Sequence, residues 1–510
     1  MLSKITSYAL VGLEGVPVDV ETDINKGMVS YELVGLPDAA VKESKERVYS
    51  AIRNSLLNFP VNKVTVNLAP ADIKKEGGQY DLPIAVSLLA ASGQLAADLD
   101  GIVMLGELAL DGALRAVNGI LPVLISAKGR GYKRFIVPAG NAGEASYIEG
   151  IEVYALKSLR ETYEFLAGTA QFKPVEVRSF ESAKGRAAYS CDLSYVRGQK
   201  MAKRALEIAV AGGHNILLSG PPGTGKTMLA RCIPTVMPDM TFEEALEVTK
   251  ILSVSGELGE EGIVSLRPFR TPHHTATTVS LCGGGNSKIR AGEISKAHRG
   301  VLFLDELPEY SRSALESLRQ PLEDGKITVT RAGGAITFPA DFILCASMNP
   351  CPCGNFGSKE KQCVCTPAQI RKYRGKISGP LLDRIDLQVE VDGIKYEELA
   401  GGEDGEKSAD VKVRVERARA IQRERFRGEE GVSVNADMGE MQIKKYCRLS
   451  PECEKILRAA FERLNLSARA RSRIIKVART IADLDSSAEI NPKHILEATS
   501  YRNFDSTAQL

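Results

Sequence analysis

One glycine-rich stretch, HNILLSGPPGTGKTMLA, constrains the fold of this chain more than any other part of its sequence. It contains the pattern Gly220-x-x-x-x-Gly225-Lys226-Thr227, with an apolar run at 216–218 that predicts a strand before it and a helical pattern after it. Between a strand and a helix, such a loop can wrap phosphates with its backbone N–H groups and the positive end of the helix. The predicted phosphate loop consists of Gly220, Pro221, Pro222, Gly223, Thr224, Gly225, Lys226 and Thr227.

The loop predicts an ATP site with a bound Mg²⁺, and a second predicted strand supplies its acidic residues. Lys226 would reach the β- and γ-phosphates, and the Thr227 hydroxyl would hold the Mg²⁺. The apolar run 301–304 ends in Asp305 and Glu306, which suits one carboxylate for the Mg²⁺ shell and one to polarise the attacking water. We assign Asp305 to the metal and Glu306 to the water. An isolated Asp-Glu pair is more often a solvated strand end, so the assignment depends on the phosphate loop.

Two further polar residues follow apolar segments of the same region. The run FILCASMNP predicts a strand that ends at Asn349, whose side chain can hold the attacking water near the γ-phosphate. In SGPLLDRIDL, Arg384 follows an apolar pair at the start of a strand. An ATPase of this layout needs a cation for the charge that develops on the transferred phosphoryl group, and a neighbouring subunit can supply it. Outside this context, Arg384 would be read as a surface ion pair with Asp383 or Asp386.

Composition and charge restrict the setting in which such an ATPase works. The chain has 510 residues, 44% of them hydrophobic and 25% charged, which is ordinary for a soluble protein of several domains. Its apolar runs are shorter than the roughly 18 residues of a membrane span, and its N-terminus lacks the apolar core of a signal peptide. We therefore expect a cytoplasmic protein with no membrane partner. Because the net charge is only +2, contact with nucleic acid requires a local basic surface.

Hydrophobic periodicity divides the chain into two α/β regions and a helical end. Residues 1–175 alternate β-branched runs with helical stretches, including a buried helix in YDLPIAVSLLAASGQL, and predict an α/β domain. Residues 176–191 are polar and non-periodic, as in a linker. Residues 192–395 form the second α/β region, which carries the predicted ATP site. Residues 396–510 begin with a glycine-rich acidic break and continue as a helical lid.

The order of these motifs resembles that of the AAA+ ATPases, in the branch of magnesium-chelatase motor subunits and MCM helicases. RPFRTPHH, GGGNSKIRAGEISKAHRGVLFLDELPEY and SGPLLDRIDL resemble the chelatase-like pattern. The resemblance implies that Arg469, just after Ser467, senses nucleotide from the lid, and that Val196 and Gln199 lie beside the adenine. Along its whole length the chain is similar to the ComM/YifB family. That similarity implies a homo-hexameric, ATP-driven motor that moves branched or single-stranded DNA during natural transformation, with recombination proteins as partners.

The first domain resembles the Lon-protease domain, an S5-like α/β fold, through GELALDGALRAVNGILPVLISAKGRGYKRFIVPAGN. Lon chemistry requires a serine nucleophile and a lysine base. This chain has Tyr80 and Asp81 where the serine would stand, and Leu121 where the lysine would stand. We therefore expect a scaffold domain without protease activity.

Four cysteines lie in one loop of the second region, PCPCGNFGSKEKQCVCTP. They are Cys351, Cys353, Cys363 and Cys365. Thiols clustered in this way in a reducing compartment favour a tetrahedral, structural Zn²⁺. The two Cys-x-Cys pairs depart from the usual Cys-x₂-Cys spacing, so reduced, partly buried cysteines without metal and an iron–sulfur cluster remain alternatives.

Three histidines of the same region do not predict a second metal site. His273 and His274 are adjacent and cannot readily face one ion together, even with His298 nearby. We interpret them as polar packing or interface residues.

The segment GKITVTRAGGAITFPADF predicts a β-hairpin that turns at 331–334. In the ATPases that the chain resembles, such a hairpin projects into the central channel of the hexamer. A second insert, at about 251–290, is expected near the same channel. The candidate contacts to DNA phosphates are Lys288, Arg290, Lys326 and Arg331.

Two other functions remain open for the same ATPase. One is a magnesium-chelatase-type motor subunit, and the other is an ATP-gated assembly factor. The N-terminal domain, the cysteine loop and the similarity along the whole chain favour the DNA motor over both.

Overall fold

The structure is a computed structural model of the chain, and it describes residues 2–184, 189–285, 289–331, 334–357, 361–393, 405–464 and 466–502. Contacts divide the chain into a first unit, Met1–Ala187 with Thr241–Ser265, and a second unit, Ala188–Met240 with Leu266–Leu510. Each unit is described by itself. Residues 241–265, expected in the second region, belong to the first unit. The domain boundaries at 175, 191 and 395 stay predictions.

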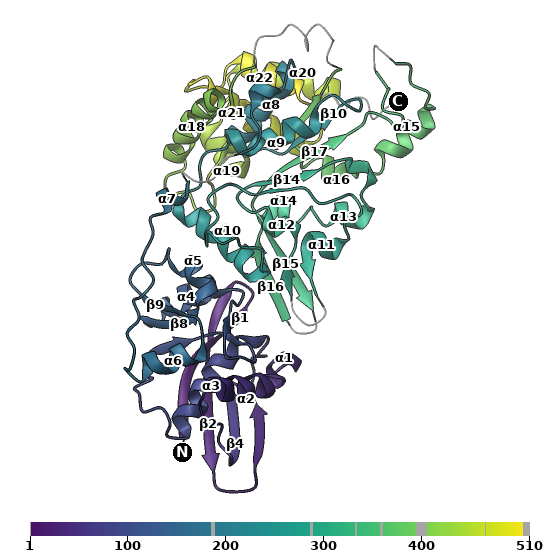
Figure 1. Ribbon diagram of the computed structural model, residues 1–510. Coiled ribbons are helices and arrows are strands. Elements are labelled where there is room, and N and C mark those ends of the chain that lie inside the picture. The colour runs from purple at the N-terminus through teal and green to yellow at the C-terminus, as the bar shows by residue number, and fades with distance from the viewer. Residues whose placement is uncertain are drawn as a thin grey trace. The chain divides into compact units, whose positions relative to one another are not determined.

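A mixed seven-stranded sheet forms the first unit, in the order β3-β4-β2-β1-β5-β8-β9 (Figure 1). β2 pairs antiparallel with β1 and with β4, and the other neighbours are parallel. The strands are β1 (Leu2–Val11), β2 (Glu14–Asn25), β3 (Ser30–Val34), β4 (Lys63–Ala69), β5 (Ile102–Met104), β8 (Arg134–Pro138) and β9 (Glu152–Leu156). β3 is therefore an edge strand of this sheet.

Helices cover the first sheet with their apolar faces. α3 (Asp81–Ala91) is buried along nearly its whole length, as its apolar sequence predicts. α2 (Ser44–Asn54) packs against α3 and leaves its other face exposed. α4 (Ile120–Gly129) packs against β2 and against α10 (Phe242–Ser255). This packing of α10 is the reason that residues 241–265 belong to the first unit.

A five-stranded parallel sheet lies in the second unit, in the order β11-β14-β17-β10-β18. The strands are β10 (Ile216–Ser219), β11 (Phe269–Arg270), β14 (Val301–Leu304), β17 (Ile343–Met348) and β18 (Leu387–Glu390). α8 (Lys200–Gly212) packs on β10 and β18, and α9 (Lys226–Val236) follows β10. Because the strands are parallel, the residues that follow them meet at one edge of the sheet, where ligands bind in open α/β sheets.

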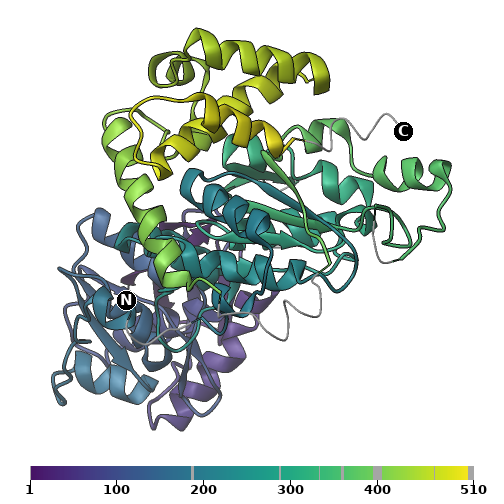
Figure 2. The ribbon, with the colours of Figure 1, turned by 90° about the horizontal axis from the view of Figure 1, so that it is seen from above.

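The chain ends in helices, as predicted. They are α18 (Ser408–Arg425), α19 (Glu440–Tyr446), α20 (Pro451–Leu464), α21 (Ala468–Leu484) and α22 (Pro492–Ser500). α18 and α21 pack against α8 and share the hydrophobic core of the parallel sheet (Figure 2). The predicted α/β class, with a C-terminal helical region, is confirmed. Among the helices of the described ranges, none has the length and apolar character needed to cross a membrane.

Candidate ATP and metal sites

The phosphate loop connects β10 to α9, and its glycines serve two purposes. Gly223 and Gly225 have φ angles of 81° and 85°, in the left-handed region that favours glycine. Gly220 is required for close packing instead, since a Cβ atom there would lie 2.1 Å from the carbonyl oxygen of Val391. The loop therefore has a tight conformation directly before the N-terminus of α9, which suits an anionic ligand.

Lys226 lies across this loop. Its ammonium group donates to the carbonyl oxygens of Gly220 and Pro221 at 2.7 and 2.8 Å, and Oδ1 of Asn349 is 3.4 Å away. The Thr224 hydroxyl also donates to the Pro221 carbonyl, at 3.0 Å. Burial lowers the pKa of Lys226, and the two carboxylates after β14 oppose that effect. Since phosphate oxygens bind a cation more strongly than neutral carbonyls do, ATP can compete for Lys226.

Asp305, at the end of β14, accepts hydrogen bonds from neutral donors. Oγ1 of Thr227 is 3.0 Å from its carboxylate, the N–H of Glu306 is 3.1 Å away, and the Ser347 hydroxyl donates as well. The structure thus brings together the two residues predicted to hold Mg²⁺, and hydroxyl and carboxylate oxygens are ligands that Mg²⁺ prefers. Sequence reasoning missed Ser347, which only the pairing of β14 with β17 could have indicated.

Glu306 has a left-handed backbone conformation with φ 53°, which is uncommon for a residue with a Cβ atom. Such conformations cluster at functional positions. Its side chain is 53% exposed, and its carboxylate lies 3.5 Å from Nδ1 of His274. The sequence predicts a packing or interface role for His274, and the structure places it beside the predicted water-polarising carboxylate. The feature that could have indicated this position is β11, which runs parallel to β14 and ends before His274.

The residues expected beside the adenine differ in exposure. Val196 is buried in the core of the second unit. Gln199 precedes α8, and its side-chain amide donates to the carbonyl oxygen of Asp392 at 2.6 Å. Because Val391 packs against Gly220, the Gln199 segment and the phosphate loop contact the same short segment after β18.

Arg384 lies at the other edge of the same sheet. Asn215, which precedes β10, donates to the carbonyl oxygen of Arg384 at 3.0 Å, whereas the phosphate loop follows β10. β10 has four residues, so roughly 13 Å of strand separates the two positions. The Arg384 side chain is buried and pairs with Glu323, whose pKa this hydrogen bond lowers, with a smaller effect from Arg469. The structure therefore groups both arginines with Glu323 and not with the phosphate loop.

The four clustered cysteines come together as predicted. Their Sγ atoms all lie within 4.8 Å of one another. Cys351 is 3.4 Å from Cys353 and 3.7 Å from Cys363. A disulfide would need an S–S distance of about 2 Å. A tetrahedron of Zn–S bonds of about 2.3 Å would separate the sulfurs by about 3.8 Å. The geometry of the thiols fits a zinc site.

The cysteine loop contacts the phosphate loop. Gly354 lies so close to Pro222 that a Cβ atom on it would be 2.5 Å from Cδ of the proline. Inside the cysteine loop, the N–H of Phe356 donates to Sγ of Cys351 at 3.3 Å. The Arg374 guanidinium lies 5.2 Å from the centroid of the Phe356 ring. The shape of the cysteine loop is thus linked to the position of Pro222.

Two of the four candidate DNA contacts can be placed with their side chains. Lys326, at the start of β15 (Lys326–Arg331), and Arg290, in β13 (Arg290–Ala291), are exposed. β15 forms the predicted hairpin with β16 (Gly334–Pro339), and it also contacts β12 (Gly283–Gly284), the partner of β13. The side chain of Arg331 and the whole of Lys288 lie outside the described residues.

The first unit has an ion pair where a Lon-type dyad would be. Tyr80 and Leu121 are buried. Asp81 is held by two hydrogen bonds from the Arg47 guanidinium, at 2.6 and 2.9 Å. Burial raises the pKa of Asp81 to about 6, although Arg47 opposes the shift. These residues offer no serine nucleophile and no lysine base.

Comparisons with known proteins agree with this architecture. Three family descriptions match in turn: Subunit ChlI of Mg-chelatase at 20–141, Magnesium chelatase, subunit ChlI at 192–399, and Magnesium chelatase, subunit ChlI C-terminal at 405–502. Uncharacterized protein YifB of Escherichia coli is 44% identical over 99% of this chain and 97% of its own length. Competence protein ComM of Haemophilus influenzae is 42% identical over 98% of this chain and 97% of its own length. The chain therefore belongs to the ComM/YifB family of magnesium-chelatase-like AAA+ proteins.

Proposed function

We propose that this chain is the subunit of an ATP-driven DNA motor, a cytoplasmic homo-hexamer that promotes branch migration while DNA is integrated in natural transformation and recombination. Similarity along the whole chain to a protein named Competence protein ComM supports a role in natural transformation. The position of Arg384 supports assembly into a ring of subunits that share their ATP sites. It lies at the opposite edge of the sheet from its own phosphate loop, which suits it, with Arg469, to the ATP of a neighbouring subunit. Recombination proteins are the expected partners.

Hydrolysis at this site would use residues of one subunit in separate roles. Lys226 would hold the β- and γ-phosphates, and Asn349, 3.4 Å from it, would position the attacking water. Glu306 would polarise that water, for which its exposed carboxylate is accessible. A Mg²⁺ held by Thr227 and Asp305 would neutralise charge on the phosphate oxygens.

DNA would be gripped by the β15–β16 hairpin. Arg331 and Lys326 on this hairpin, with Arg290 and Lys288 on the neighbouring segment, would contact phosphates. β16 leads into β17 after three residues, and β17 ends at Met348, directly before Asn349. Movement of the hairpin and recognition of the γ-phosphate would thus be joined by one continuous piece of chain.

The cysteine cluster would hold a structural Zn²⁺. Four thiolate ligands leave no open position for a water molecule, so the ion would have no part in hydrolysis. Its effect would be to fix the loop that packs on Pro222. The ATP site would then depend indirectly on metal occupancy.

A magnesium-chelatase-type motor is the second candidate. A Magnesium-chelatase 67 kDa subunit of Chlorobaculum parvum is 30% identical over 30% of this chain and 22% of its own length. An ATP-gated assembly factor, which would switch with nucleotide but not translocate, is the third.

The rate of ATP hydrolysis with and without DNA separates these candidates. A DNA motor should hydrolyse ATP several-fold faster with a four-way junction than with no DNA, and Lys226→Ala should show no such stimulation. Linear duplex of equal nucleotide content is the control for charge alone. A rate that no DNA changes would contradict the motor and favour the other two candidates.

A further inference from the structure

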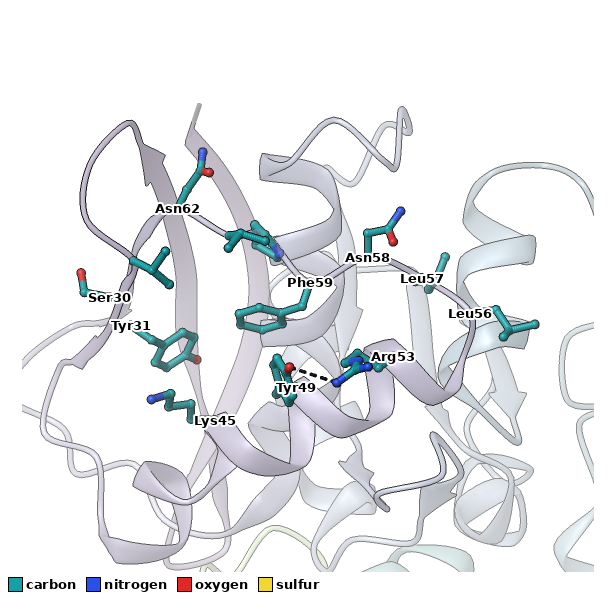
Figure 3. A pocket seen from close by; sticks show the side chains of 13 residues that line it. Ser30, Tyr31, Lys45, Tyr49, Arg53, Leu56, Leu57, Asn58, Phe59 and Asn62 are labelled. Carbon is teal, nitrogen blue, oxygen red and sulfur yellow. Dashed lines mark hydrogen bonds between the residues drawn. The ribbon is translucent and has the colours of Figure 1, made fainter.

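A groove of about 930 Å³ lies at the outer edge of the first sheet. It is formed by the edge strand β3, the exposed face of α2 and the segment 56–62, which leads into β4. Figure 3 shows Phe59 between Tyr31 and Tyr49, with Lys45 and Arg53 on either side of the rings. The groove contains none of the residues assigned to ATP, Zn²⁺ or the β15–β16 hairpin.

Three aromatic rings form the floor of the groove. The ring centroid of Phe59 lies 6.4 Å from that of Tyr31 and 5.0 Å from that of Tyr49. Tyr49 is 38% exposed, so part of its ring is available to a ligand. A row of rings of this kind offers flat apolar surface to a planar group.

Two cations flank the rings. Lys45, Tyr49 and Arg53 recur at intervals of four residues along α2 and therefore share one face. Nζ of Lys45 lies 5.9 Å from the Tyr31 centroid, and the Arg53 guanidinium lies 5.6 Å from the Tyr49 centroid. None of the 13 residues that line the groove is acidic. The groove thus combines an aromatic floor with a positive rim, which complements an anion that carries flat apolar groups.

Exposed apolar side chains continue the aromatic surface. Leu56 is 87% exposed and Val61 is 75% exposed, and both line the groove. Apolar residues gathered beside a groove commonly mark a binding surface.

We propose that this groove binds single-stranded DNA, with unpaired bases stacked on Tyr49 and Phe59 and phosphates held by Lys45 and Arg53. Aromatic side chains beside cations hold unpaired bases without sequence preference, because every base has a flat face. An acidic peptide would use the two cations but not the rings. The choice of DNA rests on the proposed function, and the site would give the first unit a DNA contact of its own.

Binding of fluorescein-labelled dT30 to the full chain, followed by anisotropy at low salt without nucleotide, tests this site. Tyr49→Ala should weaken binding roughly 10-fold, as expected for one lost stacked base. Lys45→Glu with Arg53→Glu should weaken it at least as much and make the salt dependence shallower by about 1.4 log units per log unit, for two single-strand phosphates. Lys133→Glu with Lys157→Glu, the same charge change beside β8 and β9, should bind as wild type.

Cross-linking locates the contact. Irradiated dT30 that contains 4-thiothymidine should cross-link to peptides from α2 and 56–62, and an abasic oligomer should bind more weakly than dT30. Equal binding of the abasic oligomer and dT30, with displacement by polyglutamate, would overturn the stacking site in favour of acidic peptides. Wild-type binding by both groove variants, with cross-links only in the second unit, would overturn the groove but leave the DNA motor intact. No binding of dT30 or of branched DNA by the wild type would contradict both proposals.

Discussion

Asp81, buried in the first unit, and Asp305, half-buried in the second, show how differently the two units use an aspartate. The Asp81 side chain is 1% exposed, and the Arg47 guanidinium grips both of its oxygens. The Asp305 carboxylate accepts instead from two hydroxyl groups and one backbone N–H. The Arg47 guanidinium occupies the space around the Asp81 carboxylate that a metal ion would need. A hydroxyl such as that of Thr227 can instead bind a metal ion together with Asp305.

The contrast extends to the residues beside each aspartate. Tyr80, next to Asp81, is fully buried, and so is Leu121. Glu306, next to Asp305, has a left-handed backbone and an exposed carboxylate beside His274. Two α/β units can therefore have similar layers, one in which an ion pair closes off the aspartate and one in which the carboxylates stay accessible.

Removal of Arg384 should have the largest effect on the second unit. Arg384→Ala should reduce the ATP hydrolysis rate by roughly 10³-fold, because an arginine supplied from a neighbour contributes that much or more to phosphoryl transfer. ATP affinity should change little, since Arg384 lies at the far edge of its own sheet. Steady-state turnover and binding of a fluorescent ATP analogue measure the two quantities.

Arg458→Ala is the matched control, an exposed arginine on α20 that should leave turnover unchanged. A mixture of Arg384→Ala and Lys226→Ala subunits should regain part of the activity, because some interfaces then combine the intact half of each. Full turnover by Arg384→Ala alone would show that the second unit completes its site within one subunit.

Glu306→Gln should lower turnover by about 10² or more, the usual contribution of a positioned base, while ATP still binds. Lys226→Ala should instead lose ATP affinity, because Lys226 is the cation within the phosphate loop. Binding and turnover measured side by side distinguish the two variants. If Glu306→Gln turned over ATP normally, a residue other than Glu306 would have to polarise the attacking water.

Loss of a zinc ligand should weaken ATP binding, an effect smaller than those expected for Arg384 and Glu306. Protein purified without added metal should contain one Zn²⁺ per chain by elemental analysis, and Cys365→Ser should lose it. ATP binding should then weaken about 10-fold, the size of one lost contact of about 1.4 kcal/mol, because the Gly354–Pro222 packing loosens. Cys191→Ser, a thiol outside the cluster, is the control. Wild-type protein without metal, in which all four thiols of the cysteine loop can be titrated, would refute the zinc site.

The smallest effect concerns Asp81. Its pKa of about 6 in the folded chain lies above its ordinary value of 3.8, so its contribution to stability is fully present below about pH 3.8 and is lost as the pH rises through about 6. Hydrogen exchange of the α3 amides, corrected for intrinsic rates, should show wild-type protection falling by about 2 kcal/mol between pH 4 and pH 6 relative to Asp81→Asn. ATP turnover of Asp81→Asn should match wild type.

Asp100→Asn, an exposed carboxylate of the same unit, should leave that pH dependence unchanged. A large loss of ATP turnover in Asp81→Asn would show that the first unit takes part in the chemistry after all.

Features that depend on neighbouring residues could be predicted from the sequence. Features that depend on contacts between distant segments could not. Strand, loop and helix at 216–236 follow from apolar period and glycine spacing, and the cysteines cluster because two Cys-x-Cys pairs lie in one loop. Ser347 and His274 entered the site only through the order of parallel strands, which a single sequence does not state. The placement of 241–265 in the first unit depends on packing between α10 and α4, residues that are over a hundred positions apart.

Branch migration itself tests the central claim that this chain moves DNA with the energy of ATP hydrolysis. A synthetic four-way junction with one labelled strand should be converted to two forked duplexes by the wild type in the presence of ATP and Mg²⁺. Conversion should stop when ATP is replaced by a non-hydrolysable analogue and when Glu306→Gln replaces the wild type. Junctions that stay intact while the wild type hydrolyses ATP would contradict the DNA motor.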